Sequence, residues 1–370
     1  MQRDQSAALP LTLLYVALIV YASLYPFTGW RDQGIAPWAY LQAPLPPRYW
    51  TRFDVLTNLV GYIPLGFLLT LALPFRRRAL AALAATALAA LLSFAMESLQ
   101  SYLPVRVASN LDLALNAGGG ALGALTAWAL ERLGLVQWGR RQQASWFGQR
   151  SRGALVLLAL WPVGLLFPAP VAFGLGQVLW RAQAGLAAWL AGTWLADWLP
   201  FPAVAPHLRP LAPGVEALCV ALGALAPCLL GYTVTRSWRR RALLAAAVLA
   251  VGVLVSALSA ALTYGPPHAW SWLTPPVPWG LAGAALLLLL LLWLPARGCV
   301  ALLLALLVAQ VMLLNTAPQN AYFALTLQGW ERGRFIHFNG LAQWVGWLWP
   351  YVALIYLSGR IGRADVSRFE

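Results

Sequence analysis

Residues 54–69 read DVLTNLVGYIPLGFLL, and residues 96–123 read MESLQSYLPVRVASNLDLALNAGGGALG. Both runs belong to apolar segments of about 20 residues, the length that a helix needs to cross a bilayer. Polar side chains interrupt these segments in pairs spaced three or four residues apart, which puts both members of a pair on one helix face. The pairs are Asp54 with Asn58, Glu97 with Gln100, and Asp112 with Asn116. Ionisable side chains inside a membrane segment are costly and mark functional sites, so these pairs are the first candidates for one.

The composition is that of a polytopic membrane protein. Of the 370 residues, 61% are hydrophobic and only 10% are charged, which excludes an ordinary soluble protein. The net charge of +14 comes from arginines that lie between apolar runs. Arginines in the loops between membrane helices are typical of the positive-inside rule and do not indicate nucleic-acid binding, so we expect no nucleic-acid partner. Three cysteines indicate no disulfide framework, and no cofactor is expected.

We predict an all-α transmembrane bundle of about 10 spanning helices, plus one interfacial or re-entrant helix near residues 176–200. The N-terminus has no signal-peptide cleavage site, so its apolar run is expected to be a retained first helix. The predicted helices cover residues 8–25, 54–74, 79–100, 110–131, 153–172, 211–235, 242–263, 279–296, 298–316 and 341–358.

The positive-inside rule predicts the orientation of this bundle. With the N-terminus inside, the arginines at 76–78, those within 132–152 and those at 236–241 all face the cytoplasm, and the C-terminus is inside as well. If residues 176–200 spanned the membrane, the cluster at 236–241 would face outward and break this pattern. This topology divides the chain into four segments: a four-helix membrane domain at 8–131, a basic cytoplasmic linker at 132–152, a six-helix membrane domain at 153–358 and a cytoplasmic tail at 359–370.

The same topology brings the polar pairs to one depth. Helix 54–74 begins on the outer side, helix 79–100 ends there and helix 110–131 begins there. The loop between the last two helices therefore also lies on the outer side, and its Arg106 is at the same depth as the polar pairs. We therefore predict a polar pocket in the outer leaflet. The candidate ligand-binding residues are Asp54, Asn58, Glu97, Gln100, Arg106, Asp112 and Asn116.

Each of these residues also has a structural explanation. Asp54 and Asp112 lie at predicted helix N-termini, where carboxylates cap free N–H groups, and Ser109 with Asp112 resembles a capping box. Glu97 lies in the last turn of its helix, where the dipole opposes a negative charge, so capping does not explain it. Its structural alternative is a salt bridge to Arg106. The amide side chains are explained as interhelical hydrogen-bonding groups.

A second and weaker group of polar residues lies in WERGRFIHFNG, at residues 330–340. Its candidates are Glu331, Arg334 and His337. Gly119 and Gly123 form a GxxxG pair that allows close approach of a neighbouring helix. The chain has no phosphate-binding loop, no HExxH and no G-x-S-x-G, and no metal site is expected.

Three motifs resemble the VanZ-like family of bacterial membrane proteins. They are D-x-x-x-N-x-x-G-Y-x-P-x-G at 54–66, E-x-x-Q-x-x-x-P-x-R at 97–106 and S-x-x-D-x-x-x-N-x-x-G at 109–119. The resemblance covers residues 1–131, and the rest is a looser match to the C-terminal region of longer members. It implies a multi-pass protein of the bacterial cytoplasmic (inner) membrane with a role at the cell envelope. The founding member is associated with low-level resistance to the glycopeptide teicoplanin.

Three functions are compatible with these features. The first is binding or modulation of a lipid-linked or amphiphilic envelope molecule, such as a lipid-linked precursor or a glycopeptide, with membrane lipids as further partners. The second is an integral-membrane hydrolase or transferase that uses Glu97 and Asp112 as acid and base, or its carboxylates to hold a divalent cation. The third is a scaffold whose polar pairs only hold helices together.

Overall fold

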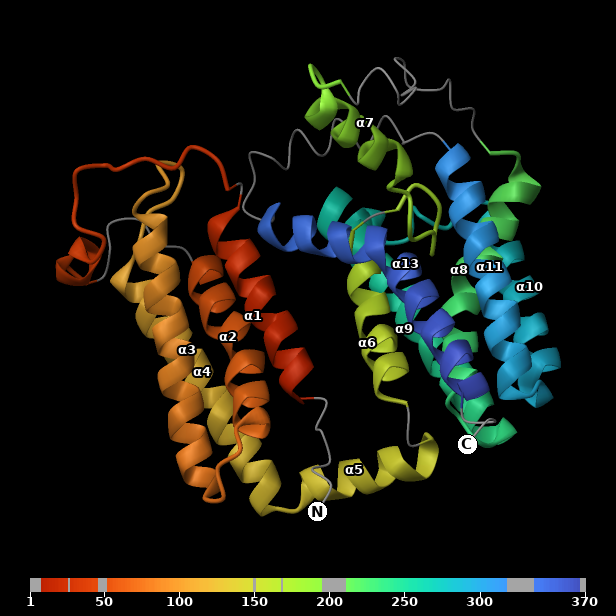
Figure 1. Ribbon diagram of the computed structural model, residues 1–370, viewed down its shortest axis with the longest axis horizontal. Helices are drawn as coiled ribbons and strands as arrows, with labels where there is room; N and C mark the ends of the chain where they lie inside the picture. Colours follow the sequence, from red (N-terminus) through yellow and green to blue (C-terminus); the bar gives the residue numbers. More distant parts are fainter. Residues whose placement is uncertain are drawn as a thin grey trace. The chain divides into compact units, whose positions relative to one another are not determined.

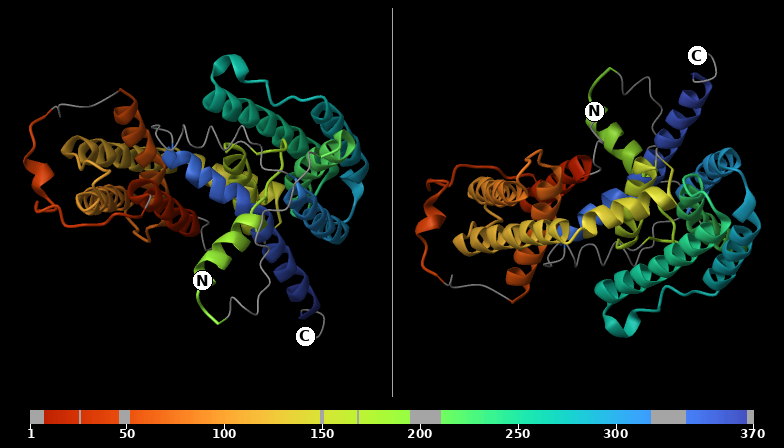
Figure 2. Two further views of the ribbon diagram at one scale, coloured as in Figure 1. Left: turned by 90° about the horizontal axis from the view of Figure 1, so that it is seen from above. Right: turned by 90° about the horizontal axis from the view of Figure 1, so that it is seen from below.

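The computed structural model describes residues 8–25, 27–45, 52–148, 151–167, 169–194, 211–317 and 336–366. The chain forms two compact units, Met1–Gln143 and Ala144–Glu370, and each is a group of helices (Figures 1 and 2). Within the described ranges no strand forms, apart from an isolated bridge between Phe147 and Thr235. The predicted all-α class is therefore confirmed.

The first unit contains four long apolar helices and a short 3₁₀ turn. They are α1 (Ala8–Leu24), η1 (Ala39–Gln42), α2 (Arg52–Ala72), α3 (Arg78–Gln100) and α4 (Asn110–Arg132). The next helix, α5 (Leu135–Trp146), crosses the boundary between the units. From the sequence we expected a basic linker here and predicted no helix.

Glycines on α4 let this helix pack directly against the backbone of α2. A Cβ added at Gly119 would collide with the carbonyl of Leu59, and one added at Gly123 would collide with the carbonyl of Ile63. Gly66 of α2 faces the backbone of Gly120 in the same way. In membranes the hydrophobic effect contributes little to the association of helices, so helix contacts commonly depend on small residues that allow close packing. The predicted close-approach face of the GxxxG pair is confirmed.

The second unit is larger and has a continuous apolar core. Its helices are α6 (Arg152–Leu165), α7 (Leu179–Leu190), α8 (Pro213–Tyr232), α9 (Trp238–Tyr264), η2 (Pro266–His268), α10 (Pro276–Leu290), η3 (Leu291–Trp293), α11 (Ala296–Thr316) and α13 (Ile336–Val366). Helix α8 lies at the centre, since nearly all of its last 14 residues are buried.

One predicted helix ends early, and the chain that follows it enters the core without helical structure. The prediction ran to residue 172, whereas α6 ends at Leu165. Prolines at 168 and 170 explain the difference, because the residue before a proline is driven out of the helical region. Phe173 is 1% exposed and has a positive φ of 63°. Irregular backbone at membrane depth is tolerated where it is buried in protein, and here α8 and α9 surround it.

Seven described helices are long and apolar enough to cross a membrane: those at Asp54–Ala72, Arg78–Gln100, Asn110–Arg132, Pro213–Tyr232, Trp238–Tyr264, Pro276–Trp293 and Ala296–Thr316. The protein is thus a multi-pass membrane protein by length and composition of its helices. Helices α1 and α6 are apolar but shorter. The count of about 10 spans and the placement of both termini inside stay predictions.

The tryptophan-rich segment at 176–200 contains the short helix α7, of 12 residues. At about 1.5 Å per residue this helix is too short to cross a bilayer, which fits a segment that does not span. Trp189 and Trp194 are 77% and 72% exposed. Residues 195–200 lie outside the described ranges.

The contact between α2 and α4 gives a direct test of the fold of the first unit. We expect Gly123→Ala to destabilise the protein by about 1–3 kcal/mol or more, because the added methyl group has no space against backbone atoms that cannot move independently. Gly61→Ala is the matched control, since a Cβ at Gly61 meets nothing within 4 Å. Thermal unfolding of the two purified variants in detergent measures the difference, and equal stabilities would contradict the packing described.

Candidate functional site

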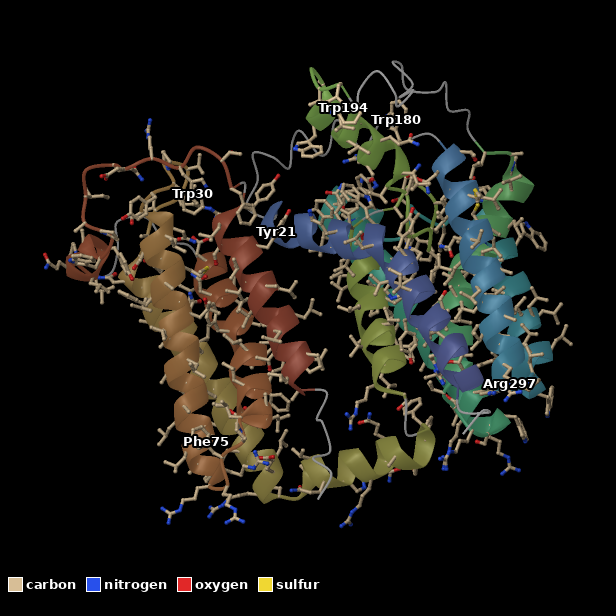
Figure 3. The ribbon with its side chains drawn as sticks, viewed as in Figure 1. Tyr21, Trp30, Phe75, Trp180, Trp194 and Arg297 are labelled. Atoms are coloured by element: carbon tan, nitrogen blue, oxygen red, sulfur yellow. The ribbon has the colours of Figure 1, made fainter. Side chains whose placement is uncertain are left out.

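The predicted candidates lie at one end of the first unit, where α1 and α3 end and where α2 and α4 begin. Figure 3 labels Trp30 at this end, which we call the loop end, and Phe75 at the opposite end. We call the seven candidates together the polar layer. Its members are Asp54, Asn58, Glu97, Gln100, Arg106, Asp112 and Asn116.

Glu97 is buried, at 4% exposure, and its carboxylate contacts the start of the next helix. Its Oε2 atom accepts the backbone N–H of Ser109 at 2.8 Å, and Ser109 is the N-cap residue of α4. The first N–H groups of a helix lack intrahelical partners and carry partial positive charge. From the sequence we considered the unfavourable dipole of Glu97's own helix and a salt bridge to Arg106, but we did not predict the N–H of Ser109 as a partner.

The N-terminus of α4 also contains the predicted cap. Ser109 Oγ accepts the backbone N–H of Asp112 at 3.3 Å, as the capping-box spacing predicted. The carboxylate of Asp112 is hydrogen-bonded to the side chain of Asn58, and it lies within electrostatic range of Asp54 and Glu97. The structure therefore brings all three carboxylates from α2, α3 and α4 into one neighbourhood.

The amide side chains join helices across the layer. Asn116 Nδ2 donates to Ser93 Oγ at 2.9 Å, which joins α4 to α3. Gln100 Nε2 donates to the carbonyl of Ser23 at 3.0 Å, which joins α3 to the end of α1. These contacts agree with the interhelical hydrogen bonding considered for the amides.

Arg106 holds the C-terminal end of α1. Its Nη2 atom donates to the carbonyl oxygens of Ala22 and Tyr25, both at 3.0 Å. The last carbonyls of a helix carry partial negative charge, so a cation is favourable there. Burial lowers the pKa of Arg106, and the charge of Glu97 raises it in part. Arg106, which we predicted as a candidate ligand-binding residue, thus also has a structural role.

Next to the polar layer, an apolar groove runs along α3 and α4, and Leu41 of η1 also lines it. We call it the α3–α4 groove. It is lined by Leu41, Ala87, Ala90, Leu91, Phe94, Asn110, Leu113, Ala114 and Ala117. Asn110 is its polar residue: Nδ2 donates to the carbonyl of Ala43 at 2.6 Å, while Oδ1 is buried and has no hydrogen-bond partner among the described residues.

Sequence reasoning missed both the groove and Asn110. Positions 87, 90, 91 and 94 repeat with the spacing of one helix face, as do 110, 113, 114 and 117, so the pattern was available in the sequence. In a membrane helix, however, apolar residues cover every face, and the pattern does not distinguish a groove from the lipid-facing surface.

Within the described residues, no group of three or more His, Cys, Asp or Glu side chains is arranged to hold a metal ion. The three carboxylates of the polar layer do not form such a group. The cysteines Cys219, Cys228 and Cys299 are free and buried. The second predicted cluster falls outside the described part: Glu331 and Arg334 lie in the undescribed segment 318–335, and the side chain of His337 is not described.

The role of Arg106 predicts a local effect of its replacement. In Arg106→Met the last carbonyls of α1 lose a charged donor, and we expect amide hydrogen exchange in residues 20–25 to accelerate by about tenfold, since a charge-assisted hydrogen bond is worth about 1.5–3 kcal/mol. Hydrogen–deuterium exchange with mass spectrometry measures this, and Arg31→Met, at an exposed position of the same end, is the control. Equal exchange in the two variants would be inconsistent with the capping role.

Comparison with known proteins supports the resemblance seen in the motifs. Residues 7–131 match the family model described as VanZ/LLP1. No curated protein and no solved structure matches the chain. The match covers α1 to α4 and hence the entire polar layer and the α3–α4 groove. Residues 7–131 of this protein are therefore similar to the VanZ/LLP1 family.

Proposed function

We propose that the protein binds a lipid-linked or amphiphilic molecule of the bacterial cell envelope at the loop end of its first unit. The tail of this molecule lies in the α3–α4 groove, and its polar head contacts the polar layer. The observation that carries the proposal is that an apolar groove along α3 and α4 reaches the end of these helices at which the buried polar layer lies.

The groove suits a tail because its walls are almost entirely alanine, leucine and phenylalanine. Small residues such as Ala87, Ala90 and Ala114 leave space between α3 and α4 where longer side chains would fill it. A lipid tail gains no hydrophobic energy by moving from the bilayer into such a groove. Selectivity therefore has to come from the polar head.

The polar layer supplies the groups that such a head needs. Carboxylates of Asp54 and Asp112 accept hydrogen bonds from hydroxyl and amide groups of sugars or peptides. A guanidinium such as that of Arg106 recognises phosphate and carboxylate groups. Asn110, at the polar end of the groove, has a buried Oδ1 atom that a ligand donor can satisfy.

The side of the membrane follows from the positive-inside rule. The arginines at 76–78 lie at the end of the first unit opposite the polar layer. With that end in the cytoplasm, the polar layer lies at the headgroup level of the outer leaflet of the cytoplasmic membrane. Lipid-linked envelope precursors and lipid-tailed glycopeptides both have a polar head at this level.

The enzymatic alternative has less support. Glu97 and Asp112 would act as acid and base, but each already has a hydrogen-bond partner within the protein. No observation on the described residues favours catalysis over binding.

Asp112→Asn tests the polar contact while keeping the size of the side chain. We expect it to weaken binding of a polyprenyl diphosphate-linked sugar about tenfold, since hydrogen bonds to charged groups contribute about 1.5–3 kcal/mol. Native mass spectrometry of purified protein measures the bound fraction. The control is Glu131→Gln on the same helix, whose carboxylate pairs with Arg78 at 3.3 Å at the opposite end.

Unchanged affinity in Asp112→Asn, at normal folded yield, would count against binding at this site. If folded yield and affinity fell together in Asp112→Asn, with Glu131→Gln unaffected, the carboxylate would instead have the purely structural role of the scaffold hypothesis.

A further inference from the structure

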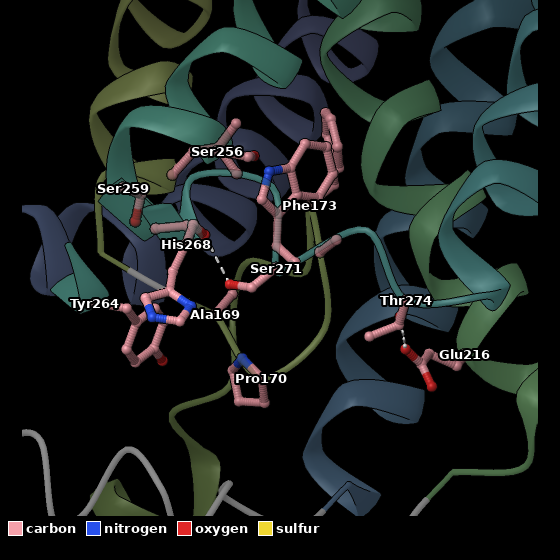
Figure 4. Close-up of a pocket in the computed structure, with 14 residues that line it drawn as sticks. Ala169, Pro170, Phe173, Glu216, Ser256, Ser259, Tyr264, His268, Ser271 and Thr274 are labelled. Atoms are coloured by element: carbon pink, nitrogen blue, oxygen red, sulfur yellow. Dashed lines mark hydrogen bonds between the residues drawn. The ribbon is translucent and has the colours of Figure 1, made fainter. Parts of the chain in front are cut away.

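A separate cavity of about 350 Å³ lies in the second unit, outside the residues that match the family model. The end of α9, the loop that contains η2, the start of α8 and the segment after α6 form its walls (Figure 4). In that view His268, Tyr264 and Ser271 lie on one side of the cavity, and Glu216 with Thr274 lies on the other. None of the predicted site residues is among the residues that line this cavity.

The cavity lies at the end of the second unit opposite Arg239, Arg240 and Arg297 (Figure 3). Arg239 and Arg240 begin α9, whereas Ser259 and Tyr264, near its end, line the cavity. Figure 3 shows Arg297 at the end of this unit opposite Trp180 of α7. By the positive-inside rule the cavity then faces the outer side of the membrane.

Glu216 gives the cavity its charge. It lies in the first turn of α8, and its Oε1 atom accepts a hydrogen bond from Thr274 at 3.1 Å, which ties the η2 loop to α8. It is the sole acidic residue of the second unit whose side chain is among those described. None of the described residues that line the cavity is an arginine. In a chain with a net charge of +14, an acidic side chain in such a wall gives the cavity a local charge that favours a cation.

Aromatic rings line the same space. Phe173, Tyr264 and Trp272 belong to the wall, and the ring centroids of Phe173 and Trp272 are 6.0 Å apart. Aromatic faces attract ammonium groups through their quadrupoles, most strongly where water is excluded. A carboxylate together with aromatic rings is therefore a chemical environment for an amine cation.

Trp272 indicates that a ligand of this cavity also carries a hydrogen-bond acceptor. Its Nε1 atom is buried and has no hydrogen-bond partner in the described part of the chain. A buried donor without an acceptor costs about 1–3 kcal/mol, and buried indole N–H groups normally find one. A ligand in the cavity that carries an acceptor oxygen can supply it.

We infer that this cavity binds a small group that carries both an amine cation and a hydrogen-bond-accepting oxygen, as in phosphoethanolamine. The amine lies between Glu216 and the aromatic rings, and the oxygen accepts from Trp272. The group comes either from a free solute or from the head of an ethanolamine lipid, whose tails would remain in the surrounding bilayer.

Isothermal titration of the purified full-length protein with phosphoethanolamine, compared with glycerol phosphate, tests the amine requirement. A parallel arm uses vesicles of phosphatidylethanolamine and of phosphatidylglycerol. We expect the amine compound to bind at least about tenfold more tightly than its amine-free counterpart in one or both arms. Binding in the first arm assigns a free solute, and binding in the vesicle arm alone assigns a lipid head.

Two variants locate the binding. Glu216→Gln removes the charge and should weaken binding about tenfold, while Ser256→Leu fills the cavity and should abolish it. Thr263→Val is the control, because Thr263 donates to its own helix at Ser259 and does not line the cavity. Equal binding of glycerol phosphate, no binding in either arm, or wild-type affinity in both Glu216→Gln and Ser256→Leu would overturn the inference.

Discussion

The hydrogen bond from the backbone N–H of Ser109 to the carboxylate of Glu97 is the constraint on which the first unit depends. A carboxylate buried at the end of an apolar helix is costly unless donors surround it. Here the donor is the start of the following helix, where unpaired N–H groups and the helix dipole favour a negative charge. The short connection from residue 101 to 109 therefore folds back so that the end of α3 and the start of α4 meet.

The glycine contacts connect the ends of α3 and α4 to α2. Gly119 and Gly123 bring the backbones of α4 and α2 into contact, so Asn58 of α2 reaches Asp112 of α4. Arg106 and Gln100 then fix the end of α1 to the same layer. Polar groups thus hold one end of the bundle, while small residues hold the middle. The α3–α4 groove lies beside this layer, on the face where α3 and α4 carry alanines instead of polar residues.

Much of this could be predicted from the sequence. Spacings of three and four residues placed each polar pair on one face, and the topology placed the pairs at one end, where the structure has them. The three motifs at 54–66, 97–106 and 109–119 indicated the family. The GxxxG pair at Gly119 and Gly123 predicted the close helix contact, and Ser109 with Asp112 predicted the cap.

The remaining features depend on contacts between segments, which sequence patterns do not encode. From the sequence, Arg106 was considered as a candidate ligand-binding residue and as a salt-bridge partner of Glu97. Its hydrogen bonds to the carbonyls of Ala22 and Tyr25, which are distant in sequence, were not predicted. Residues 166–172, which lead to the buried Phe173, were predicted as helix because they are apolar, although their prolines disfavour a helix there. The cavity near Glu216 is formed by four separate segments, and no local pattern marks it.

The central claim is that an amphiphilic envelope molecule lies in the α3–α4 groove with its head at the polar layer. The most direct measurement is photocrosslinking in living cells, with a photoreactive amino acid in place of Ala114 in the groove or of Ala79, an exposed position at the opposite end of α3. Mass spectrometry then identifies what is attached at each position. The account predicts one envelope amphiphile enriched at position 114 and lost in the Asp112→Asn background. The same mixture of bulk membrane lipids at both positions, unchanged by Asp112→Asn, would contradict it.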